Sequence, residues 1–174
     1  MNILVLGTWK EDKAKKFDCQ LKELGKILAY RNHTLVTSPS SGVQGLSARY
    51  YKENNGKSFI GYYPDLNLMK KINEKVLVKP DIPIYTNENY PVRNIKLIEE
   101  YSQGVIAITG GGGTFSEIYN AINDFNLPIA YYRGSSEKLD KALPIFGYEN
   151  NSHNGKVLWS QDIKEMVEHL EKYQ

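Results

Sequence analysis

The segment from Gly104 to Phe125, GVIAITGGGGTFSEIYNAINDF, constrains the fold of this chain more than any other part. Val105 to Ile108 form an uninterrupted apolar run, which is typical of a parallel strand buried on both faces. Four glycines follow, and after them apolar residues recur at helical spacing: Ile118, Ala121, Ile122 and Phe125. The segment therefore predicts a buried strand, a glycine loop and a helix that opens at Thr114.

The glycine loop predicts an anion site. Glycines have no Cβ, so a ligand can approach their backbone N–H groups closely. The positive end of the helix dipole favours negative charge at the same place. We therefore expect a phosphate to lie against the loop and the first helical residue, which are Gly110, Gly111, Gly112, Gly113 and Thr114.

Glu117 allows two interpretations. Thr114 and Glu117 have the spacing of a capping box, in which the hydroxyl and the carboxylate each accept from a free amide at the helix start. Alternatively, the carboxylate faces the ligand. Because it would repel a phosphate, it would then meet another part of the ligand, and a sugar is the obvious candidate.

Length and composition indicate one globular domain, which we expect to span residues 1–174. The chain has 41% hydrophobic and 24% charged residues, which is ordinary for such a domain. A net charge of +2 and the lack of a basic stripe argue against nucleic acid as a partner. Lys13, Lys15 and Lys16 have acidic neighbours, so we interpret this group as a solvated helix face.

The sequence predicts a cytoplasmic protein without a membrane partner. Its start lacks the charged and long apolar regions of a signal peptide, and no apolar run approaches the roughly 20 residues that span a bilayer. Cys19 is the only cysteine, which excludes an intrachain disulfide. We expect Cys19 to be a small buried apolar residue.

Strand-like segments recur along the chain. Besides Val105 to Ile108, we predict strands at Asn2 to Gly7, Thr34 to Thr37, Ser58 to Tyr62, Pro128 to Tyr132 and Val157 to Trp159. The segment Tyr63 to Asn89 contains several prolines, and we interpret it as an irregular, partly exposed connection over the carboxyl edge of the sheet. Loops at that edge commonly set ligand choice.

Helix-like segments lie between these strands. We predict one that ends near Asn32, one from Val43 to Lys52, a short one within Gly134 to Lys141, and one after Ser160. The alternation predicts an α/β fold of the Rossmann-like, doubly wound kind, with a mostly parallel sheet and helices on both faces.

Two further loops follow predicted strands, at the sheet edge where doubly wound folds bind ligands. Thr8 and Trp9 end the first strand. Trp9 would either stack on a purine or pack in the core or under a lid, and packing is the commoner role. Ser40, Ser41 and Gly42 follow the second strand, and they would either donate to a phosphate or ribose or form a turn that caps the next helix.

The sequence predicts no metal site and no bound cofactor. His33, His153 and His169 are far apart in sequence, and no pair has the spacing of zinc ligands. The glycine run is not followed by Gly-Lys-Ser/Thr, which argues against a Walker A phosphate loop. It also does not follow the first strand, as a dinucleotide-binding fingerprint would.

Thr109 to Glu117, TGGGGTFSE, resembles the PGGxGTxxE signature of the LOG proteins, which are cytokinin riboside 5'-monophosphate phosphoribohydrolases of a Rossmann superfamily once called lysine decarboxylase-like. Thr109 replaces the proline of that signature. Arg93 and Asn94 resemble the Arg-Lys or Arg-Asn pair that the superfamily places before the helix leading into this strand. Residues 35–64 are more weakly similar, with serines where the family has a glycine-rich loop.

The resemblance implies an N-glycosidase that releases free base and ribose 5-phosphate from a nucleoside 5'-monophosphate. Glu117 would stabilise the oxocarbenium-like ribose and hold the attacking water. Arg93 would bind and orient the substrate, and Asn94 would belong to the same nucleotide site. The resemblance also implies a homodimer or a higher homo-oligomer.

The alternative to this leading interpretation is a protein of another class, which binds without turnover. Relatives in the superfamily include molybdenum-cofactor carriers and nucleotide-sensing domains, and the Arg-Asn pair is more typical of those branches. Such a protein would bind a nucleotide or the molybdenum cofactor in the same pocket without turnover. Testing nucleoside 5'-monophosphates for release of free base would distinguish the two functions.

Overall fold

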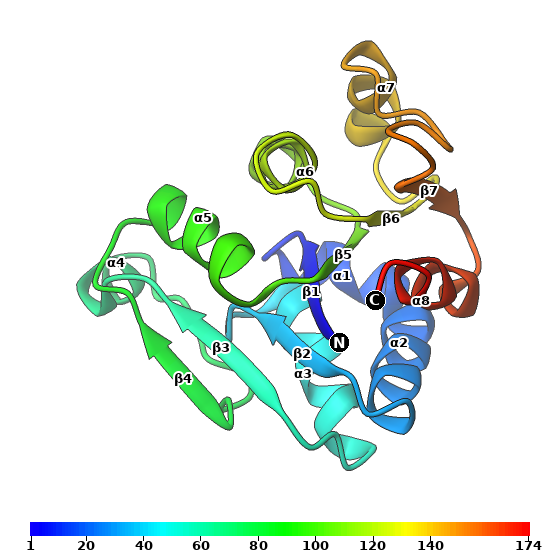
Figure 1. Ribbon diagram of the computed structural model, residues 1–174. Coiled ribbons are helices and arrows are strands. Elements are labelled where there is room, and N and C mark those ends of the chain that lie inside the picture. Colours follow the sequence, from blue (N-terminus) through cyan, green and yellow to red (C-terminus); the bar gives the residue numbers. More distant parts are fainter.

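The computed structural model describes residues 1–174 and contains one seven-stranded sheet in which all strands are parallel (Figure 1). The strands are β1 (Asn2–Gly7), β2 (Thr34–Thr37), β3 (Phe59–Tyr63), β4 (Ile82–Tyr85), β5 (Gly104–Ile108), β6 (Ile129–Tyr132) and β7 (Val157–Ser160). Their order across the sheet is β4-β3-β2-β1-β5-β6-β7. The predicted Rossmann-like α/β fold is confirmed.

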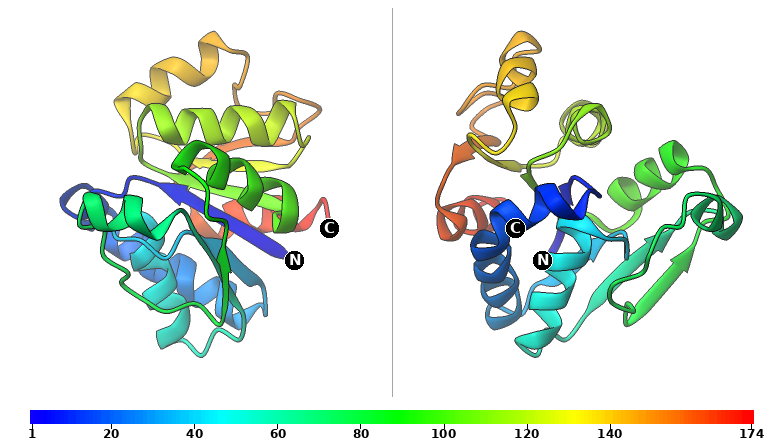
Figure 2. Two further views of the ribbon diagram at one scale, coloured as in Figure 1. Left: turned by 90° about the vertical axis from the view of Figure 1, so that its left-hand side faces the viewer. Right: turned by 180° about the vertical axis from the view of Figure 1, so that it is seen from behind.

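Helices cover both faces of the sheet (Figure 2). On one face lie α1 (Glu11–Ala14), α2 (Asp18–Tyr30), α3 (Gly42–Glu53) and α8 (Ile163–Glu171), which pack on Ile3 and Val5 of β1. On the other lie α5 (Tyr90–Tyr101), α6 (Gly112–Asn123) and α7 (Glu137–Ile145), which pack around Leu4 and Leu6. Because both faces are buried, β1 reads as a continuous apolar run rather than as an alternating pattern.

Most predicted boundaries hold to within a residue or two. Helix α2 ends at Tyr30, two residues before Asn32. Asn32 has a φ of 57°, the left-handed conformation expected after a helix end. Helix α8 buries the predicted apolar face: Ile163, Met166, Val167 and Leu170. Strand β3 begins one residue later than predicted, at Phe59.

The interpretation of residues 63–89 as an irregular connection is wrong in two places. Helix α4 (Leu66–Lys71) is capped by Asp65, whose side chain accepts from the amide of Asn67 at 2.7 Å. Strand β4 pairs in parallel with β3 at the edge of the sheet. Pro83 is compatible with that strand because an edge strand has a ladder partner on one side only.

Cys19 is exposed, which contradicts the prediction that it is buried. It lies on the outer side of α2, whereas Leu21, Leu24 and Leu28 of the same helix face the core. Tyr50, Tyr51, Tyr62 and Tyr63 are buried, as a packing role requires. None of the helices is both long enough and apolar enough to cross a bilayer.

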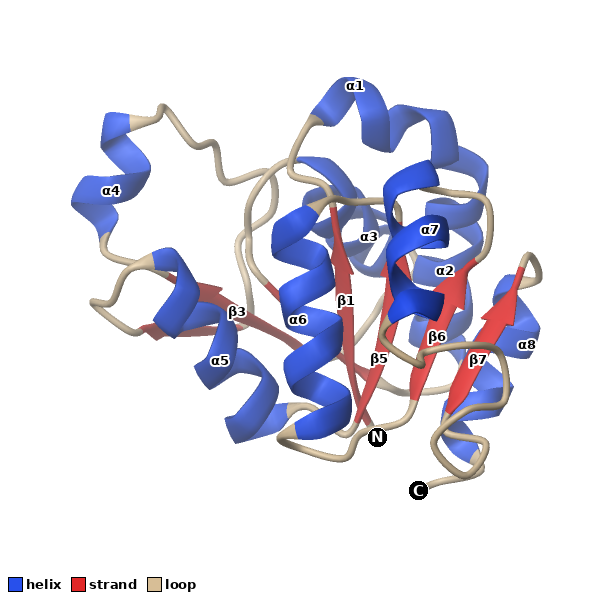
Figure 3. Ribbon diagram, turned by 90° about the horizontal axis from the view of Figure 1, so that it is seen from above, coloured by secondary structure: helices blue, strands red, loops and turns tan.

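The strand order creates a switch point between β1 and β5. From β1 the chain moves outward through β2, β3 and β4, then returns to pair β5 with β1 and continues the other way through β6 and β7. Loops that leave the carboxyl ends of β1 and β5 therefore diverge, and doubly wound folds bind ligands in such a crevice. Figure 3 shows both strands pointing to the same edge, where α6 begins.

Candidate functional site

A pocket of about 540 Å³ lies at this switch point. The loops after β1, β2 and β5 line it together with the start of α5 and one residue of α7. Among its lining residues are Thr8, Trp9, Arg93, Asn94, Gly110, Gly111, Gly112, Gly113, Thr114 and Glu117. The fold thus brings most of the residues predicted for the site into one cavity, although they are far apart in sequence.

The glycine loop faces open space. A Cβ atom on Gly111, Gly112 or Gly113 would meet no other atom within 4 Å. Helix α6 begins at Gly112, and its N-cap residue Gly111 supplies no side chain to the free amides. The amides from Gly111 to Thr114 have no acceptor within the chain. The loop therefore presents unpaired donors at the positive end of a helix, as an anion site requires.

The capping-box interpretation of Thr114 and Glu117 is wrong. Because α6 starts at Gly112 rather than at Thr114, Thr114 lies inside the first turn and Gly111 occupies the cap position. No side chain caps this helix start. Both residues are buried to more than nine-tenths and line the pocket instead. Of the two interpretations, the structure thus excludes the capping box.

Glu117 lies near a buried cation, Arg93. Burial raises the pKa of Glu117 to about 7, although the positive charge of Arg93 acts in the opposite direction. Burial lowers the pKa of the Arg93 guanidinium, and the negative charge of Glu117 partly offsets that effect. The two side chains form no direct ion pair. Both residues line the same pocket.

Arg93 is held by its neighbours but keeps a free donor. It lies in the first turn of α5, not before that helix as the family pattern indicates. One terminal nitrogen donates to the carbonyl of Tyr62 at 3.2 Å, and the guanidinium lies 5.6 Å from the ring centre of Tyr90. Its Nε is buried without an acceptor. This orphaned donor is available to a ligand.

Two buried acceptors in the pocket walls also lack partners. They are Oε1 of Gln44 and Oδ1 of Asn94. Gln44 is fixed by the hydrogen bond that its Nε2 donates to the carbonyl of Gly7 at 3.1 Å. Unsatisfied buried polar atoms are rare in folded proteins. Their concentration around one pocket indicates a site that a polar ligand completes.

The structure does not bring Ser41 or Gly42 to the pocket wall. The Ser41 hydroxyl donates to the carbonyl of Trp9 at 2.9 Å, and Gly42 starts α3 with a φ of 74°. A Cβ on Gly42 would lie 2.1 Å from the carbonyl oxygen of Thr8, so only glycine permits this close approach. Ser41 occupies the N-cap position of α3, but its side chain does not cap the helix. Of the predicted residues of this loop, Ser40 lines the pocket, together with Ser38.

Trp9 is not a core residue. Its side chain is 59% exposed and lines the pocket together with Thr8, which excludes the alternative of packing in the core. The aromatic surface it presents at the mouth of the pocket is of the kind on which a flat heterocycle stacks.

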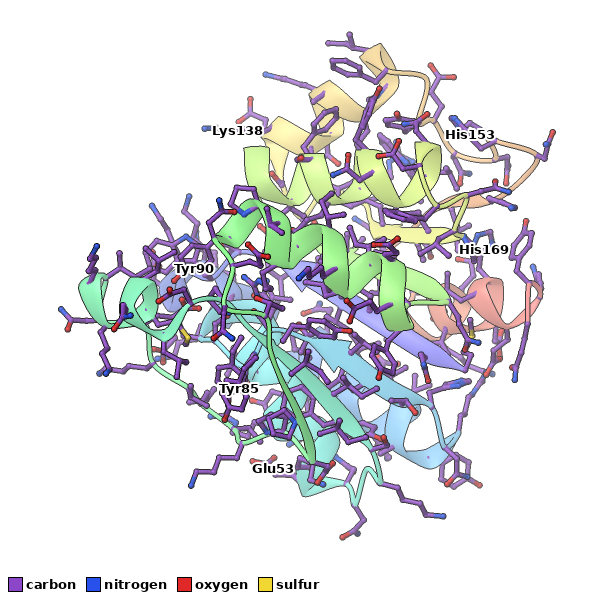
Figure 4. All side chains as sticks on the ribbon, turned by 60° about the vertical axis from the view of Figure 1, so that its left-hand side comes forward. Glu53, Tyr85, Tyr90, Lys138, His153 and His169 are labelled. Atoms are coloured by element: carbon purple, nitrogen blue, oxygen red, sulfur yellow. The ribbon has the colours of Figure 1, made fainter.

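Several lining residues were not predicted from the sequence: Lys10, Lys13, Ile72, Glu74, Tyr90 and Lys138. Lys13 is exposed, as expected for a solvated helix face, and it nevertheless reaches the pocket. Their position in the sequence could have indicated three of them. Lys10 and Lys13 follow β1 and Lys138 follows β6, so each comes after the carboxyl end of a strand, where doubly wound folds bind ligands. Figure 4 shows Lys138 and Tyr90 at the same end of the molecule, with His153 and His169 at the other.

The histidines lie outside the site. His33 contacts Glu171 at 2.8 Å, and His169 contacts the carbonyl of Lys156 at 3.0 Å. Nowhere in the chain do three or more His, Cys, Asp or Glu side chains form a group that could hold a metal ion.

Solved structures of several proteins resemble this fold along nearly its whole length. TM1055 is 21% identical, with a TM-score of 0.81 and 98% of each chain covered. The molybdenum cofactor carrier protein of Chlamydomonas reinhardtii is 25% identical, with a TM-score of 0.77, covering 99% of this chain and 96% of that one. The molybdenum cofactor binding protein of Rippkaea orientalis is 22% identical, with a TM-score of 0.74 and coverages of 98% and 94%.

A search among curated proteins found no match. The sequence matches the model of the SLOG cluster4 family over residues 1–167. This match extends well beyond the glycine-rich motif, and it supports the resemblance to LOG-like proteins at the level of the SLOG superfamily. The chain therefore belongs to the SLOG cluster4 family.

Proposed function

We propose that this protein binds and carries a small phosphorylated ligand of the nucleotide or molybdenum-cofactor class without converting it chemically. The observation that carries the proposal is the glycine loop, whose free amides from Gly111 to Thr114 open toward the pocket at the start of α6. Amides at a helix start favour a phosphate group, and charge-assisted hydrogen bonds are among the stronger ones.

The remaining walls suit the uncharged part of such a ligand. Gln44 and Asn94 each have a buried acceptor without a donor, and Arg93 has a buried donor without an acceptor. Leaving such a group unpaired costs about 1–3 kcal/mol. The hydroxyls of a ribose, or the amino and ring nitrogens of a purine or pterin, would satisfy these atoms and remove that cost.

The environment of Glu117 supports binding without turnover. N-glycosidic cleavage develops positive charge on the sugar, which an ionised carboxylate stabilises. Burial raises the pKa of Glu117 to about 7, so the carboxyl group holds its proton more readily near neutral pH than an ordinary carboxyl group does. The nearby Arg93 guanidinium would also oppose a developing cation. Similarity to the molybdenum cofactor carrier protein, 25% identical over 99% of this chain, supports the same function.

A phosphoribohydrolase acting on nucleoside 5'-monophosphates is the second candidate. The observation that favours it is the position of Glu117, which lines the pocket beyond the glycine loop, one helical turn from Gly113. A 5'-phosphate on the loop would direct the sugar toward this carboxyl group. Arg93 would then orient the substrate and Glu117 would hold the attacking water.

Gly112 offers a sharp test of the phosphate site. A side chain at this position enters open space and the backbone is not left-handed, so Gly112→Asp should fold. We expect wild-type protein to bind AMP at least tenfold better than adenosine, and inorganic phosphate to compete. Gly112→Asp should abolish the preference through charge repulsion, while Gly112→Ala, the uncharged control, should keep most of it.

Calorimetry with both ligands on all three proteins gives the answer. Equal affinities of the wild type for AMP and adenosine, without competition by phosphate, would overturn the phosphate site and both candidate functions with it.

A second experiment separates carrier from enzyme. Protein purified from a host that makes the molybdenum cofactor is analysed for molybdenum and for pterin fluorescence. It is also incubated with AMP, CMP, GMP, UMP and N6-substituted AMP. A carrier should retain its ligand intact and release no base. Release of free base, lost in Glu117→Gln, would establish the hydrolase instead.

A further inference from the structure

The anion site carries more positive charge than a single phosphate needs. Lys10, Lys13 and Lys138 all line the pocket, and all three are exposed. None of them forms an ion pair in the structure. Together with Arg93, they give the pocket four cationic side chains against two carboxyl groups, those of Glu74 and Glu117.

The lysines surround the glycine loop because of the strand order. Strand β5, which leads into the loop, lies between β1 and β6. Lys10 and Lys13 follow β1, and Lys138 follows β6, so positive charge approaches the loop from both sides. Figure 4 shows Lys138 beside the start of α6.

The acidic residues close to these lysines in sequence form no ion pair with them. Glu11 pairs with Lys15 at 2.9 Å, and Glu137 pairs with Lys141 at 2.6 Å. Within the pocket, Glu74 accepts a hydrogen bond from the hydroxyl of Tyr90. Asp12 is exposed and does not line the pocket. The three lysines are therefore left to an anion that comes from outside the chain.

We propose that the pocket takes a ligand with a diphosphate group, in which one phosphate binds the glycine-loop amides and the next lies between Lys13 and Lys138. This assignment rests on the proposed function and narrows its ligand class to diphosphate esters, such as nucleoside diphosphates and dinucleotides. The cavity of about 540 Å³ is within the usual range for a ligand of that size.

Inorganic phosphate and pyrophosphate test the assignment without any assumption about the organic part. Their affinities are measured by calorimetric titration or competition at low and moderate salt. A unit charge at ~4 Å in water is worth about a fivefold change in affinity per lysine. We therefore expect pyrophosphate to bind at least tenfold more tightly than phosphate. The advantage should shrink at higher salt, because the lysines are exposed.

The double variant Lys13→Gln/Lys138→Gln should remove most of the pyrophosphate advantage and leave phosphate affinity within about twofold. Lys16→Gln is the matched control, because Lys16 lies close to Lys13 in sequence, is exposed and does not line the pocket. It should leave both affinities unchanged.

The possible failures are distinguishable. If phosphate binds but pyrophosphate has no advantage, or if the advantage survives in the double variant, the diphosphate assignment is wrong and the proposed function stands. Loss of the advantage in Lys16→Gln as well would also overturn it, because general surface charge would then explain the preference. If neither anion binds, the phosphate site itself fails.

Discussion

At the scale of single residues, Thr109 shows how this chain departs from the family signature that it resembles. Its φ is 52°, and its amide donates to the hydroxyl of Ser135 at 2.8 Å in a buried hydrogen bond. Proline, which the LOG signature has at this place, fixes φ near −65° and has no N–H. The glycine loop of this protein therefore has a conformation that proline cannot adopt.

Thr109→Pro should lower the free energy of unfolding by at least about 2 kcal/mol, because it loses a buried hydrogen bond and strains the loop. Thr109→Asn is the control, since asparagine tolerates a positive φ and keeps the amide. Urea denaturation of both variants measures the effect. A proline variant as stable as the wild type would contradict the loop conformation described above.

Sequence reasoning found the residues whose chemistry is local and missed those that the fold assembles. The glycine loop, Glu117 and Arg93 could be predicted because their types and spacing form a pattern. Helix α6 begins at Gly112, two residues before the predicted start at Thr114. The sequence does not indicate this start, because the cap residue Gly111 has no side chain that could cap the helix. For Lys138 the only signal was its position after a strand, since its place in the pocket depends on β6 lying beside β5.

At the scale of elements, the connection between α4 and α5 forms one wall of the pocket. Ile72 and Glu74 follow α4, Tyr90 begins α5, and all three line the cavity. The hydroxyl of Tyr90 donates to the carboxylate of Glu74 and so ties the connection to α5. The position of this segment over the carboxyl edge of the sheet was predictable, but β4 was not, because it is a short, largely exposed edge strand interrupted by Pro83.

Tyr90→Phe should loosen this wall while it preserves the ring under Arg93. Losing the hydrogen bond should lower the local opening free energy by about 1 kcal/mol. The amide of Glu74, which donates to the carbonyl of Met69 at 2.9 Å, should then exchange with deuterium about fivefold faster. Bound ligand should also dissociate faster.

Tyr85→Phe on β4 is the matched control, because the hydroxyl of Tyr85 forms no hydrogen bond in the structure and its ring stacks on Tyr63 at 4.8 Å. It should leave exchange at Glu74 unchanged. If Tyr90→Phe exchanges no faster than this control, the contact between Tyr90 and Glu74 does not hold the wall in place.

At the scale of the whole molecule, the sheet explains why the site and the stability of the fold are linked. The strand order was predictable only in outline, since alternating strands and helices indicate a doubly wound sheet without fixing the positions of β4 and β5. Placing β5 beside β1 brings α6 over the centre of the sheet, where Glu117 becomes buried among core residues. The carboxyl group of Glu117 thus lines the pocket and is also part of the packed interior.

That burial makes stability depend on pH in a definite direction. The pKa of Glu117 is raised from 4.5 to about 7 in the folded state, so the folded protein holds a proton that the unfolded chain has released. Between about pH 4.5 and 7, this group therefore lowers stability as the pH rises. The full effect, present above pH 7, corresponds to about 3 kcal/mol.

Glu117→Gln should remove this dependence, because glutamine resembles the protonated carboxyl group at every pH. The wild type and the variant should have similar unfolding free energies at pH 4.5, and the variant should become the more stable protein by up to about 3 kcal/mol at pH 8. Comparing the two proteins cancels the titration of other groups. Urea denaturation at several pH values measures the difference, and a difference that stays constant across this range would show that folding does not raise the pKa of Glu117.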